Sequence, residues 1–293
     1  MKKQFMKKGD YPSAKERVEE LIKRLEEGVT NFQYDPEEFK ALLEMKALMP
    51  NYSFRNLLVA KAQLPDASFI APFKRWSELG RKVKKGALSI RIFAPRFKKV
   101  EEEEAKNSEK HKLVGFVAVP VFDVSQTEGD PLPIDRFKIQ LEGDCPEAKE
   151  IIKMVEDVSD CPIQYGDTGD ANGFYSQLDH SITVSDKLSI NHRAKTLVHE
   201  YVHSQCHRLG DKSSSKEREV VAEGCAFVVC NYFGLDTSDY SFRYVKGWSQ
   251  GDADALMTFG SQICDVSGKI IHLFEEWREA NKNQEKVKEV EVA

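Results

Sequence analysis

Apolar and polar positions recur with two different periods along the chain. Between residues 12 and 27, apolar residues recur at helical intervals among charged ones, with Pro12 at the start and Gly28 at the end. Apolar or alternating runs at 87–94 and 113–122 are instead typical of strands. Helical patterns also cover the segments 36–48, 53–63, 73–79, 146–158, 188–209, 217–232, 239–248 and 252–279.

A turn-rich stretch at residues 125–133 interrupts this pattern and marks a domain boundary. We therefore expect an N-terminal domain of helices and strands over 1–127. A mainly helical C-terminal domain with a small sheet is expected over 134–280. Residues 281–293 are polar and charged, which predicts a flexible tail. The expected fold class is α+β, and the length of 293 residues agrees with two ordinary domains.

Chemistry enters with the pentapeptide HEYVH at residues 199–203, an HExxH motif inside a predicted helix. Because four residues make about one helical turn, the imidazoles of His199 and His203 lie on one face and can bind a single Zn²⁺ ion. The Glu200 carboxylate is then placed to take a proton from a water molecule that the metal activates. The alternative is an exposed helix with two unrelated histidines, since the motif alone also arises by chance.

A zinc site of this kind needs a third protein ligand. The next predicted helix offers Glu219 and Glu223, one turn apart on the same face, and small residues at Ala222 and Ala226 would let it approach the first helix. We predict that Glu219 is the ligand and that Glu223 supports a liganding histidine through a hydrogen bond. A solvated helix face is the alternative for either glutamate.

Other candidates near the motif have weaker chemical grounds. His207 lies one turn further along the same face and is interpreted as a neighbour of the site or a surface residue. The thiols of Cys206, Cys225 and Cys230 form no CxxC pair, which favours buried structural cysteines. Tyr244 is a candidate for stabilising an oxyanion, with packing as a core aromatic residue as the alternative.

Two strand-like runs, 173–176 and 181–185, precede the motif and flank a turn at Asp179-His180. In a metallopeptidase, a strand at this position can bind an extended substrate along its edge. An ordinary hairpin explains the same pattern equally well.

Charge is distributed unevenly, although the net charge is only −5. Residues 1–125 contain 25 Lys and Arg against 18 Asp and Glu, a net charge of +7, whereas residues 126–293 contain 18 against 30, a net charge of −12. Ten basic residues and the single acid Glu78 lie between Lys74 and Lys99, with aromatic residues interleaved. Basic groups bind phosphates and aromatic faces stack on unpaired bases, so single-stranded nucleic acid is a reasonable partner.

The residues predicted to contact this partner are Lys74, Arg75, Trp76, Arg81, Lys82, Lys84, Lys85 and Arg91. A basic hairpin with aromatic residues in its core is the alternative, because Phe93 alternates with Ile90 and Ile92 in a strand-like run. The charge run at 98–112 is interpreted as a solvated hairpin tip.

The chain resembles the ArdC-like proteins of plasmids, phages and integrative elements. The N-terminal resemblance lies in YSFRNLL at 52–58, FKRWSELGRKVKKG at 73–86, IFAP at 92–95 and VFDVSQT at 121–127. The C-terminal resemblance lies in HExxH, in the helix that carries Glu219 and Glu223, and in YVKGW at 244–248. The serine-rich segment at 210–216 leaves the register of the third ligand open.

This resemblance implies a single-stranded-DNA-binding domain followed by a zincin-like metallopeptidase domain related to the ImmA/IrrE peptidases. It also implies an antirestriction role, in which the protein protects or processes incoming DNA. Our leading hypothesis is a zinc metallopeptidase joined to a DNA-binding domain, with a protein or peptide substrate of unknown identity. The rival hypothesis is a non-catalytic protein that coats single-stranded DNA and whose zinc site is structural or vestigial.

Composition narrows the cellular setting. No apolar run reaches transmembrane length, and the first predicted helix is highly charged, so neither a membrane span nor a signal peptide is expected. Six scattered cysteines without a disulfide framework agree with a reducing cytoplasm. We therefore expect a cytoplasmic protein.

Overall fold

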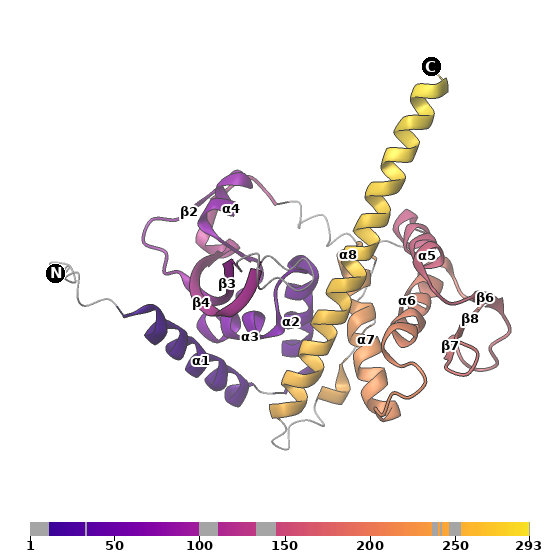
Figure 1. Ribbon diagram of the computed structural model, residues 1–293, viewed down its shortest axis with the longest axis horizontal. Helices are drawn as coiled ribbons and strands as arrows, with labels where there is room; N and C mark the ends of the chain where they lie inside the picture. The colour runs from indigo at the N-terminus through magenta and orange to yellow at the C-terminus, as the bar shows by residue number, and fades with distance from the viewer. Residues whose placement is uncertain are drawn as a thin grey trace. The chain divides into compact units, whose positions relative to one another are not determined.

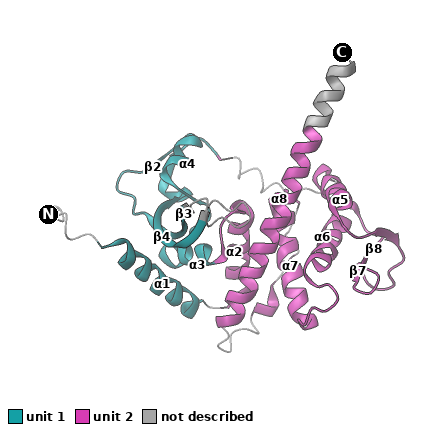
Figure 2. Cartoon of the chain, in the orientation of Figure 1, with its two compact units in different colours: residues 1–32, 55–131 teal, residues 33–54, 132–293 magenta. Residues whose placement is uncertain are grey.

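Helices dominate the computed structural model, and three small sheets accompany them (Figure 1). The structure describes residues 12–32, 34–99, 111–132, 145–235, 240, 242–245 and 253–292; for Lys99, His111 and residues 283–292 it describes the backbone only. The mixture of helices and small sheets confirms the α+β class. The chain groups into two compact units, residues 1–32 with 55–131 (unit 1) and residues 33–54 with 132–293 (unit 2) (Figure 2).

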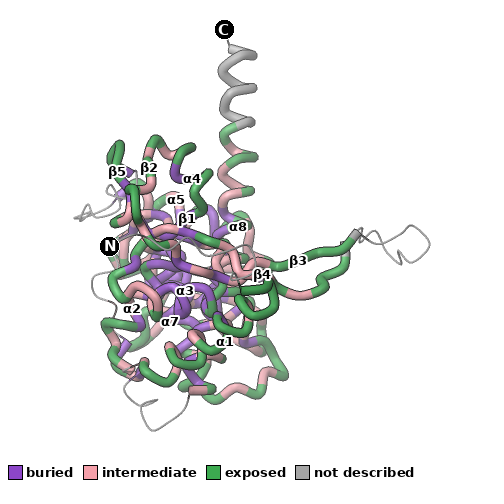
Figure 3. The backbone as a smooth tube through the Cα atoms, turned by 90° about the vertical axis from the view of Figure 1, so that its left-hand side faces the viewer, coloured by how far each residue is buried: buried purple, intermediate pink, exposed green. Residues whose placement is uncertain are grey.

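Unit 1 is built around a long antiparallel pair of strands, β3 and β4, which extends Cα partners from Ile90 and Val121 to Lys99 and His111. Both strands are longer than the sequence pattern predicts, and their outer part projects from the unit as an exposed ribbon (Figure 3). The elements of this unit are α1 (Ala14–Asn31), α3 (Phe54–Gln63), β1 (Ile70–Ala71), α4 (Phe73–Glu78), β2 (Arg81–Val83), β3 (Ile90–Lys99), β4 (His111–Asp123), η1 (Val124–Gln126) and β5 (Thr127–Gly129).

Two side-chain amides of α3 complete the outer edge of β3. Asn56 donates to the Phe93 carbonyl and accepts from the Phe93 N–H, both at 2.9 Å. Gln63 makes the same pair of bonds with Arg91, at 2.8 and 2.9 Å. These amides replace a neighbouring strand and satisfy backbone groups that would otherwise lack protein partners.

A buried turn at the end of β4 joins three parts of unit 1. Asp123 accepts hydrogen bonds from the backbone N–H groups of Ser68, Phe69 and Ser125 at 2.8 to 3.1 Å. Gln126 forms a capping box with Asp123 and also donates to the Leu88 carbonyl at 2.7 Å. The VFDVSQT segment is therefore a structural turn, because its polar side chains are used within the fold.

Unit 2 stacks helices against a small sheet. Helix α6 packs between α7 on one side and strands β7 and β8 on the other, and α7 also packs on α2 and α8 (Figure 1). The sheet has the order β6-β8-β7, with β6 parallel and β7 antiparallel to β8. The elements are α2 (Pro36–Leu48), α5 (Pro146–Val158), β6 (Ile163–Gly166), β7 (Gly173–Ser176), β8 (Ser181–Ser185), α6 (Ile190–Cys206), α7 (Ser215–Tyr232) and α8 (Ala253–Val292).

The expected N-terminal domain over 1–127 needs a correction, because residues 33–54 group with the C-terminal part. Helix α2 packs on α7, and Phe39 is fully buried with its ring centroid 5.6 Å from that of Phe242. Phe227 of α7 lies against the same Phe242 ring at 5.3 Å. An apolar helix joins whichever core can bury it, and hydropathy alone does not say which core that is.

Most predicted elements are present within two or three residues of their expected bounds, and α2 and α5 match both ends. Helix α8 is longer than predicted, since its backbone continues to Val292 through the expected flexible tail. Most of the helix predicted at 239–248, and the tip within 98–112, lie outside the described residues. Within the part of the chain that the structure describes, no helix is both long and apolar enough to cross a membrane.

Candidate metal centre

The helix that carries HExxH has defined ends. Ser189 caps its N-terminus by accepting a hydrogen bond from the His192 N–H, and the helix ends at Cys206, four residues before Gly210 with its φ of 97°. Its apolar face is buried, with Leu197, Val198 and Val202 all at 0% exposure. The helix is therefore fixed by packing, and its polar face is held in one orientation.

Three side chains from two helices converge on one point. The Nε2 atoms of His199 and His203 lie 3.1 Å apart. The Glu219 carboxylate bridges them, with one oxygen 3.2 Å from His199 Nε2 and the other 3.4 Å from His203 Nε2. All three ligand atoms lie within 4.8 Å of one another, so these residues could hold one metal ion.

The register of Glu219 is set by the start of α7. Ser214 and Glu217 form a capping box, in which the Ser214 hydroxyl accepts from the Glu217 N–H at 3.3 Å and the Glu217 carboxylate accepts from the Ser214 N–H at 2.7 Å. This Ser-x-x-Glu pattern is readable from the sequence and resolves the register that the serine-rich segment left open. It places Glu219 one turn into the helix, facing the histidines.

The two glutamates of α7 have different surroundings. Hydrogen bonds from His199 and His203 hold the pKa of the Glu219 carboxyl well below its ordinary value. Burial raises the pKa of Glu223 to about 7, although the charge of His199 opposes this shift. Glu223 therefore lies beside the histidine pair without bridging it, as the prediction of a ligand and a supporting residue requires.

Glu200 is almost completely buried, at 7% exposure, on the sheet side of α6. Burial raises the pKa of its carboxyl, and the charges of His199 and His203 and a backbone hydrogen bond with Tyr175 oppose the increase. Gly173 of β7 makes this approach possible. A Cβ atom there would lie only 2.8 Å from Thr196 Cγ2 and 3.4 Å from Glu200 Cγ, which the sequence did not reveal.

His207 is a buried neighbour of the site, at 2% exposure, and not a surface residue. Its Nδ1 atom lies 2.8 Å from Nδ1 of His203. Burial lowers the pKa of His207 to about 4, so its imidazole is neutral at pH 7 and can orient the His203 ring through a hydrogen bond.

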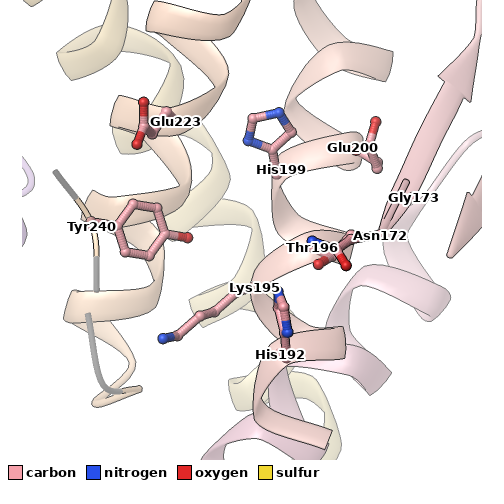
Figure 4. Close-up of a pocket in the computed structure, with 9 residues that line it drawn as sticks. All are labelled: Asn172, Gly173, His192, Lys195, Thr196, His199, Glu200, Glu223 and Tyr240. Atoms are coloured by element: carbon pink, nitrogen blue, oxygen red, sulfur yellow. The ribbon is translucent and has the colours of Figure 1, made fainter. Parts of the chain in front are cut away.

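Two pockets flank these residues and share Gly173, His199 and Glu200. In the first, His199 points toward the helix that bears Glu223, while Glu200 points toward the strand that begins at Gly173 (Figure 4). Its lining consists of Asn172, Gly173, His192, Lys195, Thr196, His199, Glu200, Glu223 and Tyr240. The second follows residues 173–178 and reaches His203, His207, Ser215, Arg218 and Glu219.

Tyr240, rather than Tyr244, lines the pocket (Figure 4). The Tyr244 hydroxyl lies 3.5 Å from the Val220 carbonyl, and its ring packs edge-on against Phe242. The prediction of Tyr244 as an oxyanion-stabilising residue therefore needs correction, because its hydroxyl faces the backbone of α7. No sequence motif distinguishes the two tyrosines.

A polar cluster ties the β7–β8 hairpin to the end of α6. The Tyr175 hydroxyl lies 2.9 Å from His180 Nδ1, and Asp160 lies 3.6 Å from His180 Nε2. Asp160, Cys161 and His180 also have ligand atoms within 4.8 Å of one another. However, Arg208 donates to Asp160 at 2.6 Å, so a guanidinium already neutralises this carboxylate.

Several predicted DNA-binding residues are engaged within unit 1. Trp76 is at 0% exposure and donates to the Phe122 carbonyl at 3.0 Å, so its assignment as a base-stacking residue is wrong. Lys74 and Arg75 both lie within 4.0 Å of Glu78. Arg81 donates to Thr127 and to the Asp130 carbonyl, and Lys84 donates to the Ser125 carbonyl.

The other predicted contacts remain available. Lys82 and Lys85 are exposed, and Arg91 is half-buried in β3. Phe93, considered as a core aromatic, is also half-buried and packs edge-on against Phe116. Among the cysteines near the metal centre, Cys225 and Cys230 are fully buried thiols, as predicted, whereas Cys206 is half-buried.

Known proteins resemble this chain over different parts of its length. Residues 12–122 match the N-terminal domain of anti-restriction factor ArdC, and the chain is ArdC-like on this ground. An uncharacterized protein of Bacillus anthracis is 25% identical over 345 aligned residues, which cover 98% of this chain and 58% of that protein. The chain thus spans little more than half the length of this relative.

Two crystal structures of the antirestriction ArdC protein from the R388 plasmid are also similar. The metal-free structure has a TM-score of 0.48 at 19% identity and covers 76% of this chain and 83% of its own. The Mn(II)-bound structure has a TM-score of 0.48 at 18% identity and covers 82% and 96%.

Proposed function

We propose that this ArdC-like chain is a zinc metallopeptidase joined to a single-stranded-DNA-binding unit, and that it acts in antirestriction by protecting transferred DNA. The peptidase assignment is carried by one observation. His199, His203 and Glu219 converge on a single point beside the buried Glu200, and pockets open on both sides of this point.

The donor set supports Zn²⁺ as the ion. Two imidazole Nε2 atoms that face each other at 3.1 Å and a carboxylate that bridges both are the ligands of catalytic zinc sites with two His and one Glu. Three protein ligands leave room for a further ligand in the pocket. When bound, the ion supplies the Lewis acidity that activates water and polarises a scissile carbonyl.

Glu200 supplies the proton transfer in this proposal. Its carboxylate adjoins His199 and Gly173 in both pockets, where an attacking water molecule and a peptide carbonyl can meet. It accepts a proton from the attacking water and delivers it to the leaving amine. Burial raises its pKa toward the working pH, which favours both transfers.

Strand β7 offers a place for the substrate. It occupies one edge of its three-stranded sheet, and its backbone runs from Gly173 past the metal-binding residues. An extended peptide can pair with this edge and continue into the pocket on either side. Tyr175 in the same strand is anchored through His180, which keeps the edge in place.

The DNA-binding half of the proposal rests on unit 1. The match to the ArdC N-terminal domain and the net charge of +7 over residues 1–125 both favour a nucleic-acid partner. The rival is a non-catalytic DNA-coating protein with a structural metal. A structural site is closed and needs no Glu200, so the open pockets favour the peptidase.

The test compares wild type with Glu200→Gln in zinc-loaded full-length protein. A mixture of random-sequence peptides is incubated with each protein, with and without oligo(dT), and cleavage is followed by mass spectrometry. We expect wild type to cleave peptides and Glu200→Gln to retain zinc but lose cleavage. The exposed Glu279→Gln variant serves as the matched control and should cleave like wild type. Zinc-loaded wild type that cleaves nothing under any condition would support the non-catalytic rival.

A further inference from the structure

We infer that single-stranded DNA binds to one face of the β3–β4 ribbon and to an arginine-lined pocket at its base. This inference rests on the proposed DNA-binding function and specifies its surface. It replaces the segment from Lys74 to Lys85, which the sequence favours and where the structure uses most of the candidate side chains for internal contacts.

The pocket lies among α1, α3 and the start of β3. Arg17 and Arg24, seven residues apart and so on the same face of α1, line it together with Arg91 of β3. Glu20 also lines it and accepts from Arg24 at 2.7 Å. Three guanidinium groups against one carboxylate leave a positive site, which suits a phosphate that can accept paired N–H donors.

Apolar side chains in the same pocket give it a second character. Leu21 and Ile90 are buried in its wall, Leu64 is half-buried, and Leu88 is 84% exposed at its rim. A pocket with both apolar and cationic walls fits a nucleotide better than a free inorganic anion, since the base can contact the apolar part.

An aromatic face leads outward from Arg91 along the ribbon. Side chains alternate along a strand, so Arg91, Phe93 and Phe97 share one face of β3. Phe116 and Leu113 of β4 lie on this face as cross-strand partners of Pro95 and Phe97. Phe97, Phe116 and Leu113 are 56%, 51% and 50% exposed, which is high for large apolar side chains in neighbouring positions. Exposed phenylalanine rings can stack on unpaired bases of any sequence.

The opposite face of the ribbon is basic. Lys98 and Lys112 are directly opposite each other across the two strands, and Arg96 precedes them on the same face. Like charges in directly opposite positions destabilise a strand pair. A polyanion wrapped along the ribbon would neutralise them while its bases contact the aromatic face.

The experiment measures binding of full-length protein to fluorescein-labelled oligo(dT) by anisotropy over a range of salt concentrations. The double variant Phe97→Ala/Phe116→Ala should bind at least about tenfold more weakly, with a nearly unchanged salt dependence, because stacking is lost. Arg17→Ala/Arg24→Ala should weaken binding and reduce the slope of log affinity against log salt by about two, one for each lost phosphate contact. Lys15→Ala/Lys23→Ala, on the same helix but outside the pocket, is the matched control and should bind like wild type.

The outcomes separate this inference from the function on which it rests. If both test variants are folded by circular dichroism and bind like wild type, the ribbon and pocket are not the DNA surface. If Lys82→Ala/Lys85→Ala alone loses binding, the DNA lies on the segment that the sequence favours, and the proposed function survives without this inference. If wild type itself does not bind oligo(dT) at low salt, the DNA-binding function fails.

Discussion

The metal centre of unit 2 and the DNA-binding region of unit 1 relate to their sequence motifs in opposite ways. In HExxH, the residues that make the motif are the functional atoms, with His199 and His203 joined by Glu219. In unit 1, the motif residues Trp76 and Asp123 are at 0% exposure and hold the fold. The most exposed aromatic residues of the ribbon lie outside those motifs.

The difference follows from what each function requires. A metal ion needs its donor atoms at fixed distances, so the ligands must keep a fixed spacing on a helix. Binding of a nucleic-acid backbone needs positive charge and aromatic faces, and many arrangements of side chains supply them. A motif in a DNA-binding region is therefore weaker support for contact than a motif in a metal site.

The largest effect that we expect comes from removal of the metal. A chelator should abolish peptide hydrolysis, because the Lewis acid is lost, while oligo(dT) binding persists in unit 1. Parallel assays of cleavage and anisotropy before and after chelation measure both, and re-addition of Zn²⁺ controls for damage. Loss of DNA binding on chelation would show that the two regions are not separate in function.

The second prediction separates the two glutamates of α7. Glu219→Gln should lower Zn²⁺ affinity by more than the roughly hundredfold that an outer partner costs, because the bridging carboxylate is lost. Glu223→Gln should cost less, since its carboxylate does not bridge the histidine pair. Competitive titration with a zinc indicator gives both values. The reverse order would exchange the roles of the two residues.

The third prediction concerns Trp76. Trp76→Ala should lower the free energy of unfolding by about 3–5 kcal/mol, because it leaves a cavity and an unpaired carbonyl at Phe122. Phe73→Ala, at a 60% exposed position in the same helix, should cost much less. Urea denaturation measures the difference. A small effect at Trp76, together with weakened DNA binding, would restore its role as a stacking residue.

The smallest effect is expected at His207. His207→Ala should weaken Zn²⁺ binding by about 10- to 100-fold, because the His203 ring loses the partner that orients it. The exposed His272→Ala on α8 is the matched control. Unchanged Zn²⁺ affinity in the first variant would mean that packing alone orients His203.

The sequence predicted those features that depend on local patterns. Helices α2 and α5 match their expected bounds, since Pro at the start and apolar periodicity fix both ends. The position of Glu219 follows from the Ser214-Glu217 capping box. The grouping of α2 with α7, the burial of His207 and the access of Tyr240 to the pocket depend on tertiary packing, for which no local signal exists.

The unit 1 surface was misplaced for a related reason. Basic and aromatic residues cluster in sequence between Lys74 and Lys99, but internal acceptors occupy several of them, including Arg81 and Lys84. Whether a side chain faces a carbonyl or solvent is decided by chain segments that lie far away in the sequence. Arg17 and Arg24 reach the pocket from such a distant segment.

A crystal structure of the zinc-soaked chain, with anomalous diffraction recorded at the zinc edge, tests the central claim most directly. The account predicts a peak at about 2.0–2.2 Å from the Nε2 atoms of His199 and His203 and from a carboxylate oxygen of Glu219. A peak coordinated by Glu223 in place of Glu219, or by Asp160, Cys161 and His180, would contradict it.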